Sequence, residues 1–345
     1  AGPGGGGAGG RRPAPPARIR DADVTEDRDL ARFDRRFFEG RETFTVIGSG
    51  ALGGKAAGLR SAREALADRP AALRFQDLEI SVPTLTVIGT DVFDAFLDRN
   101  RLRELVAGGA DDQRVAVAFQ RAELPVELAG DLWALVREVH TPLAVRSSSL
   151  LEDALAHPFA GVYATKMIPN NQHDAETRFR KLAEAIKFVY ASTFFRAARD
   201  YVRATGQAPE GEKMAVIVQE VVGHRHGPRF YPDVAGVARS WNFYPTGHAR
   251  PEDGVVDLAF GLGKTIVDGG RTWTCSPAHP RAVPPFNSVG HMLEQTQTEF
   301  WAVNMGAPPA YDPTAETEYL VHAHVTAAEE DGTLAGVAST YDPES

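Results

Sequence analysis

The stretch FTVIGSGALGGKAAGL (residues 44–59) combines an apolar strand pattern, a glycine-rich turn and a helix start. The alternating residues 44–48 predict a strand, and we expect the helix from about Lys55 onward. Glycines such as Gly53 and Gly54 free the backbone to approach an anion, and Lys55 adds a point charge at the helix start. The stretch fits a phosphate-binding turn or, equally well, a simple strand–helix turn with a solvated lysine.

Two glycine loops come close to the phosphate-binding loop of P-loop nucleotidases without matching it. That pattern requires a glycine five residues before its second glycine. In the first loop this position is Ser49. In the second loop, GLGKT at residues 261–265, it is Leu258. The spacing therefore argues against an unrelated P-loop ATPase.

The stretch LAVRSSSLLED (residues 143–153) is a buried strand pattern that runs into a serine loop. Ligands of α/β folds sit at strand ends, and the planar guanidinium of Arg146 matches phosphate oxygens. Arg146 could therefore form a bidentate contact with phosphate oxygens. The alternative is an ion pair between this arginine and the acidic pair 152–153.

The stretch MAVIVQEVVG (residues 214–223) predicts a buried strand that ends in Gln219 and Glu220. The amide and carbonyl groups at this end would contact the edge of an adenine at a hinge between two lobes. The alternative is a core strand with an exposed polar end.

A fourth stretch, VVDLAFGLGKTIVDGGRTW (residues 255–273), predicts a strand that enters a glycine loop. Asp257 and Asp268 lie on either side of this loop. Mg²⁺ requires oxygen ligands, so both are candidate metal ligands. A hairpin with a charged rim explains the same pattern without a metal.

The order of the motifs is more specific than any single motif. Between about Gly48 and Arg271 the chain carries Gly-Gly-Lys, Val-Arg-Ser-Ser with Glu-Asp, Phe-Ala-Gly, Ala-Val-x-Val-Gln, Gly-Val-Ala and Gly-Leu-Gly. This order resembles the ATP-binding (PEP/pyruvate-binding) domain of pyruvate phosphate dikinase and phosphoenolpyruvate synthase, in a divergent bacterial branch. The resemblance implies an α/β fold with mixed sheets, an ATP-grasp-like nucleotide-binding domain of two lobes, with ATP and Mg²⁺ between them.

The resemblance also implies roles for single residues. Lys55 and Arg146 would hold the ATP phosphates and take part in catalysis, and Gln219 would line the adenine pocket. Family enzymes move a phosphoryl group from ATP to a histidine on a separate swivelling domain, and from there to an acceptor held by another domain. The full set of expected nucleotide-binding residues is Gly53, Gly54, Lys55, Arg146, Ser147, Ser148, Gln219, Glu220, Gly261, Gly263 and Lys264.

Two departures from the family pattern favour a second hypothesis, a non-catalytic nucleotide-binding regulatory module. Lys264 stands where the family commonly has a glutamate near the metal, and a protonated lysine cannot ligate Mg²⁺. If a helical turn starts there, Asp268 shares a face with Lys264 and becomes the first candidate ligand, with Asp257 the second. The family's Thr-Arg-Asp-Pro is replaced by SWNF at residues 240–243.

Composition narrows the remaining choices. The 345 residues suggest two lobes, 21–205 and 206–345, after a disordered Gly/Pro-rich segment 1–20. A net charge of −9 argues against nucleic-acid or anionic-membrane partners. The sequence has no apolar run long enough to predict a membrane span. The single cysteine, Cys275, suits a reducing cytoplasm. The chain begins at Ala1 and lacks the family's Thr-Ser-His-Ala carrier motif, so we expect a module of a longer phosphotransferase.

Overall fold

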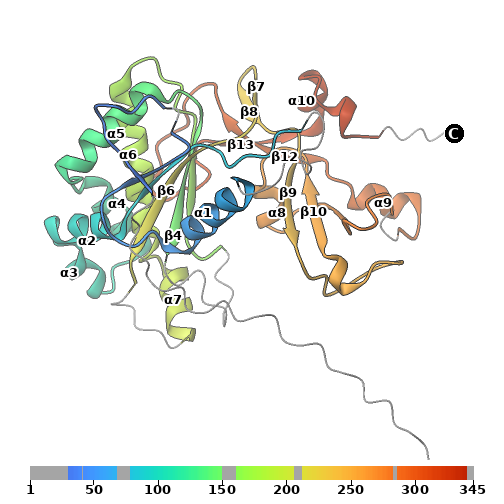
Figure 1. The fold of residues 1–345 in the computed structure, drawn as a ribbon, viewed down its shortest axis with the longest axis horizontal. Helices are drawn as coiled ribbons and strands as arrows, with labels where there is room; N and C mark the ends of the chain where they lie inside the picture. Colours follow the sequence, from blue (N-terminus) through green and yellow to red (C-terminus); the bar gives the residue numbers. More distant parts are fainter. Residues whose placement is uncertain are drawn as a thin grey trace, which may run out of the picture. The chain divides into compact units, whose positions relative to one another are not determined.

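The computed structural model describes residues 30–40, 42–67, 78–149, 161–205, 212–282 and 286–339. The chain forms two compact units, residues 1–30 and 31–345. Only Leu30 of the first unit is described, so the predicted disorder of residues 1–20 lies outside the described residues. Figure 1 shows the helices and strands of the second unit.

A six-stranded mixed sheet is the largest sheet of this unit, with the order β1-β2-β3-β6-β4-β5. Strands β1, β2 and β3 run parallel to one another, whereas β6 runs antiparallel to both β3 and β4. The strands are β1 (Ala31–Arg32), β2 (Phe44–Ile47), β3 (Leu85–Ile88), β4 (Leu143–Ser149), β5 (Thr165–Ile168) and β6 (Met214–Glu220). The predicted loop at the serine run is wrong, because all three serines belong to β4 and are buried.

Helices connect these strands. They are α1 (Gly53–Ala67), α2 (Thr90–Arg99), α3 (Leu102–Ala107), α4 (Asp112–Arg121), α5 (Val126–Glu138), α6 (Ala175–Ser192) and α7 (Arg196–Thr205). The amino-acid pattern of residues 173–205 predicts one long helix, but the structure forms two, α6 and α7. The break lies at residues 193–195, where Phe194 packs against Phe93 and Phe119, with ring centroids 6.1 and 5.7 Å apart.

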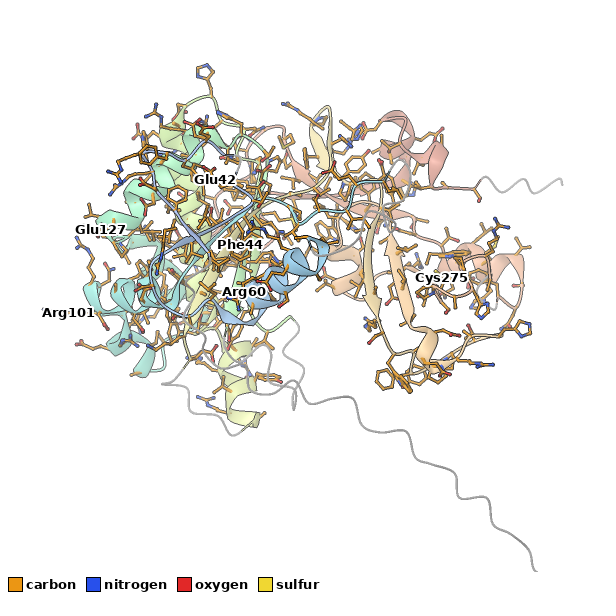
Figure 2. All side chains as sticks on the ribbon, in the orientation of Figure 1. Glu42, Phe44, Arg60, Arg101, Glu127 and Cys275 are labelled. Carbon is orange, nitrogen blue, oxygen red and sulfur yellow. The ribbon has the colours of Figure 1, made fainter. Side chains whose placement is uncertain are left out.

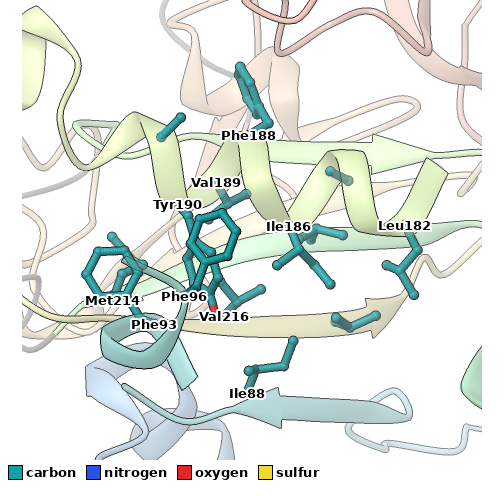
Figure 3. Packing of buried hydrophobic residues seen from close by; sticks show 14 of the residues in the cluster. Ile88, Phe93, Phe96, Leu182, Ile186, Phe188, Val189, Tyr190, Met214 and Val216 are labelled. Atoms are coloured by element: carbon teal, nitrogen blue, oxygen red, sulfur yellow. The ribbon is translucent and has the colours of Figure 1, made fainter. Parts of the chain in front are cut away.

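Helix α6 packs against one face of the six-stranded sheet and forms the main core with it. In Figure 3, Leu182, Ile186 and Val189 of α6 point toward the strands of the sheet, with Val189 nearest to Val216 of β6. These side chains are almost completely buried, which removes their apolar surface from water and stabilises the fold. The opposite face of β4 and β6 carries Arg146, Ser148 and Gln219 together with buried apolar residues such as Ile217.

Two smaller antiparallel sheets follow in the sequence, with the orders β11-β10-β9 and β13-β12-β8-β7. Their strands are β7 (His224–His226), β8 (Arg229–Tyr231), β9 (Ala235–Arg239), β10 (Val255–Ala259), β11 (Trp273–Cys275), β12 (Glu299–Asn304) and β13 (Leu320–His324). The helices of this part are α8 (Lys264–Val267), α9 (Val289–Gln295), α10 (Val325–Glu330) and the short 3-10 turns η3 (Pro251–Asp253) and η4 (Leu334–Gly336). Figure 2 labels Cys275, which ends β11.

The predicted lobe boundary before residue 206 cuts through the six-stranded sheet. Strand β6 follows that boundary in the sequence, yet it lies between β3 and β4 and is bonded to both. The division into two lobes stays a prediction, and β6 belongs with the strands of the first. None of the helices in the described ranges has the length and apolar character needed to cross a membrane.

Candidate nucleotide-binding site

The start of α1 is docked on strand β4. The Ser148 hydroxyl accepts a hydrogen bond from the Ala56 backbone N–H (3.1 Å) and donates one to the Leu52 carbonyl (2.8 Å). Gly53 has a φ of +72°, and a side chain there would collide with the Ser148 backbone carbonyl. Glycine is therefore required at this position both for its backbone conformation and for the close approach.

Lys55 and Arg146 enter the same region from two segments far apart in the sequence. The Lys55 ammonium donates a hydrogen bond to the Ser147 hydroxyl (3.1 Å). The Arg146 guanidinium donates one to the Gln219 side-chain carbonyl (3.0 Å). Because side chains alternate along a strand, Arg146 and Ser148 share one face of β4, away from the α6 core. Lys55 thus contacts Ser147, and Arg146, the neighbouring residue of β4, contacts Gln219.

Glu220 lies apart from this group. It follows Gln219 on β6, so its side chain points to the opposite face of the strand. There its carboxylate accepts a hydrogen bond from the Thr141 hydroxyl (2.8 Å). The alternative partners of Arg146, the acidic pair 152–153, lie outside the described residues.

The second glycine loop is built around Phe300 and Trp301 of β12. Gly261 has a φ of +79°, and a Cβ atom there would come within 2.9 Å of the Trp301 carbonyl. Gly263 then precedes α8, which begins at Lys264, so the predicted helical turn is confirmed. The Lys264 ammonium lies 3.1 Å from an Asp268 carboxylate oxygen and 3.9 Å from one of Glu316.

The two predicted metal ligands do not fit Mg²⁺ as their side chains stand. Asp268 is paired with Lys264. Asp257 accepts hydrogen bonds from the Arg239 guanidinium (2.7 Å) and the Thr274 hydroxyl (2.6 Å), one on each oxygen. Within the described ranges, no three His, Cys, Asp or Glu side chains are grouped as a metal site. Lys264 beside Asp268 and Arg239 beside Asp257 supply the positive charge that a bound metal would otherwise supply.

Sequence patterns missed Asp91, the second residue of α2. Its carboxylate accepts hydrogen bonds from the backbone N–H groups of Ser49 and Gly50, both at 2.8 Å, and from the Ser49 hydroxyl at 3.0 Å. The sequence feature that could have indicated Asp91 is its position just after the strand pattern of β3. Strands β2 and β3 are parallel neighbours, so the residues that follow them meet at one edge of the sheet.

Comparison with known proteins agrees with this geometry. A curated relative, the "Uncharacterized phosphotransferase YvkC" of Bacillus subtilis (strain 168), is 29% identical over 196 residues. These residues are 56% of this chain and 21% of the relative, so the chain spans about a fifth of that protein. The family model of the pyruvate phosphate dikinase AMP/ATP-binding domain matches residues 49–293, which include both glycine loops, β4 and β6. The chain therefore belongs to the family of the pyruvate phosphate dikinase AMP/ATP-binding domain, an ATP-grasp-like nucleotide-binding fold.

Proposed function

We propose that this chain binds ATP through Lys55, Arg146 and the start of α1, and serves as the nucleotide-binding part of a phosphotransferase. The observation that carries the proposal is that Lys55, in the first turn of the fifteen-residue helix α1, bonds Ser147, the residue of β4 next to Arg146. A helix N-terminus favours anions, and a lysine and an arginine beside it provide charge-assisted hydrogen bonds to phosphate oxygens. Family membership supports the choice of an adenine nucleotide.

The side chains of this site suit phosphoryl transfer by positioning and charge neutralisation. Lys55 would neutralise phosphate oxygens at the helix start, and Arg146 would do so from β4, while its bond to Gln219 fixes the guanidinium. In the proposed step, the bond from the transferred phosphorus to the ATP bridging oxygen breaks. A new bond forms to a ring nitrogen of a histidine on a separate swivelling domain, and the nucleotide leaves with the bridging oxygen.

The histidine-bearing domain and the domain that binds the final acceptor belong to this proposal as partners. The size of the curated relative, of which this chain spans about a fifth, leaves room for such domains in that protein. A requirement for Mg²⁺ and a cytoplasmic location also stay proposals. Because Asp257 and Asp268 do not fit the metal as they stand, we assign no step of the transfer to them.

One observation favours a second function, a nucleotide-binding regulator without transfer activity. Lys264, which stands in place of the family's glutamate, lies between Asp268 and Glu316. A lysine held by two carboxylates has its charge neutralised before any nucleotide binds. Both functions require ATP binding, but only the transferase would transfer a phosphoryl group to a histidine. A measurement of that transfer therefore separates them.

Isothermal titration calorimetry of the chain with ATP tests the part common to both functions. We expect saturable binding of ATP, and weaker binding of adenosine, because the two cations contact phosphates. The measurement is made in Mg²⁺ and repeated in EDTA, so that the metal requirement is determined in the same series. The absence of both heat and a thermal shift at millimolar ATP would contradict the proposed function.

A further inference from the structure

The glycine loop between β2 and α1 is fixed at its first residues by a carboxylate of its own chain. The Asp91 carboxylate accepts hydrogen bonds from the backbone N–H groups of Ser49 and Gly50 and from the Ser49 hydroxyl. Two backbone bonds flank this clamp, from the Gly89 N–H to the Ile47 carbonyl (2.9 Å) and from the Thr90 N–H to the Ala51 carbonyl (3.1 Å). The loop is thus bound to the β3–α2 junction along its length.

Three glycines make room for this carboxylate. A Cβ atom on Gly48, which has a φ of +87°, would lie 2.6 Å from an Asp91 carboxylate oxygen. A Cβ on Gly89 would lie 2.7 Å from the same oxygen, and one on Gly50 would collide with the Asp91 backbone nitrogen. These glycines allow the backbone to approach Asp91. The sequence alone suggested that glycines of this loop approach a phosphate.

Consecutive backbone N–H groups that point to one spot form an anion-binding concavity. Here the N–H groups of Ser49 and Gly50 form such a concavity, and Asp91 fills it. Burial raises the pKa of Asp91, but the bonds from Ser49 and Gly50 outweigh it, so the pKa lies below its ordinary value. The carboxylate therefore stays charged at neutral pH, and these two N–H groups are engaged before a nucleotide arrives.

We infer that Asp91 is a positioning residue for Lys55: it holds the first half of the glycine loop so that α1 presents the lysine to the ATP phosphates. The other half of the loop is held by Ser148, which bonds Leu52 and Ala56. Lys55 lies between Leu52 and Ala56, inside the part of the segment that Ser148 holds. The inference rests on the proposed function, since it assumes that Lys55 binds phosphate.

A simpler role for Asp91 is local stabilisation of α2, because acidic residues are favourable in the first helical turn. The chain offers a matched control for this role. Asp174 caps α6 by accepting the Thr177 N–H (2.7 Å), and its pKa is also lowered by that bond. Asp174 has no hydrogen bond to the glycine loop among the bonds recorded for the described residues.

The test is a double-mutant cycle on Asp91 and Lys55, with ATP and adenosine affinities measured by calorimetry. Asp91→Ala should weaken ATP about tenfold or more, because charge-assisted bonds that fix the loop are lost, and should leave adenosine affinity unchanged. In a Lys55→Ala background, Asp91→Ala should cause no further loss. Asp91→Asn, which keeps a carbonyl oxygen as acceptor, should recover part of the affinity. Asp174→Ala should lower the melting temperature without changing ATP affinity.

Each alternative result has a defined meaning. If Asp91→Ala weakens ATP equally with and without Lys55, or weakens adenosine to the same extent, Asp91 acts on the fold and the inference is wrong. If Asp91→Ala does not fold, Ser49→Ala replaces it, since it removes one of the three loop bonds. Wild-type ATP affinity in both Ser49→Ala and Asp91→Asn would also overturn the inference. A wild-type chain that does not bind ATP contradicts the proposed function itself, and the inference falls with it.

Discussion

At the scale of single residues, the proposed site separates residues that would contact a ligand from residues that hold them in place. Resemblance to the family identified Lys55 and Arg146, and the structure brings both to the α1–β4 junction. It did not identify Asp91, because this residue binds backbone N–H groups, which belong to no motif. The same limit applies to Lys264, whose partner Glu316 comes from a distant segment.

The two cations should determine the affinity for phosphate. We expect Lys55→Ala and Arg146→Ala each to weaken ATP binding by about 1.5–3 kcal/mol, the range for hydrogen bonds to charged groups. Adenosine binding should change little, because adenosine has no phosphate. Calorimetry with both ligands measures the difference, and Arg60→Ala on the same helix serves as the control. Equal losses for ATP and adenosine would instead indicate a defect in the fold.

Asp268 tests whether the second glycine loop holds a metal. Its carboxylate is 45% exposed and pairs with Lys264 at 3.1 Å. We expect Asp268→Asn to lower the free energy of unfolding by only about 0.3–0.5 kcal/mol, as for other exposed pairs one helical turn apart. The effect of Mg²⁺ on ATP affinity should survive the substitution. If that effect disappears, Asp268 is a metal ligand, and Asp257→Asn becomes the next variant to measure.

At the scale of helices and strands, local patterns predicted several elements but not their boundaries or partners. The strand at residues 44–48 and the helix after Lys55 are confirmed as β2 and α1. The serine run was predicted as a loop because serine is typical of turns. In the fold, β6 pairs with every residue of β4 through Ser149, which extends the strand. Such pairing joins distant segments, so a local pattern cannot reveal it.

A carboxylate at the C-terminal end of helix α10 bonds two side chains of β8. Asp331 accepts hydrogen bonds from the Arg229 guanidinium (2.7 Å) and the Tyr231 hydroxyl (2.8 Å). Bonding to Arg229, assisted by Tyr231, lowers the pKa of Asp331 below its ordinary value of 3.8 despite partial burial. A lowered folded-state pKa means that this stabilisation is present above the ordinary value and is lost as the pH falls through the lowered one.

Asp331→Asn should therefore cost about 1.5–3 kcal/mol of unfolding free energy at neutral pH, the range for hydrogen bonds to a charged group. The difference between wild type and variant should shrink as the pH falls below 3.8 and through the lowered folded-state pKa of Asp331, where the wild-type carboxyl also becomes neutral. Urea denaturation at several pH values measures it. Asp200→Asn, in an exposed pair with Arg203, should show almost no such dependence. A difference that stays constant with pH would mean that Asp331 acts through packing alone.

At the scale of the whole chain, the fold extends beyond the residues that the family model matches. That match ends at residue 293, whereas β12 and β13 follow it and pair with β8 and with each other. Strand β12 also supports the second glycine loop, because the Trp301 carbonyl accepts the Leu262 N–H (3.0 Å). The motifs named the family, but the later strands complete the surroundings of Lys264. Sequence analysis missed this contribution because β12 carries no motif.

The last prediction decides between transferase and regulator. The chain is mixed with ATP labelled in its phosphates and with a histidine-bearing domain of pyruvate phosphate dikinase, added as a separate protein. We expect the label to appear on that histidine. The physical reason is that the Lys55–Arg146 site neutralises charge on a phosphoryl group in transfer, which a regulator does not require. Labelling should be acid-labile, as expected for a phosphoramidate, and should be lost in Lys55→Ala. Asp174→Ala, whose substitution lies on α6 away from the glycine loop, should label as wild type does. If the chain binds ATP tightly but labels no histidine, whether ATP or the histidine-bearing domain is added first, the regulatory function explains Lys264 better than the transferase function does.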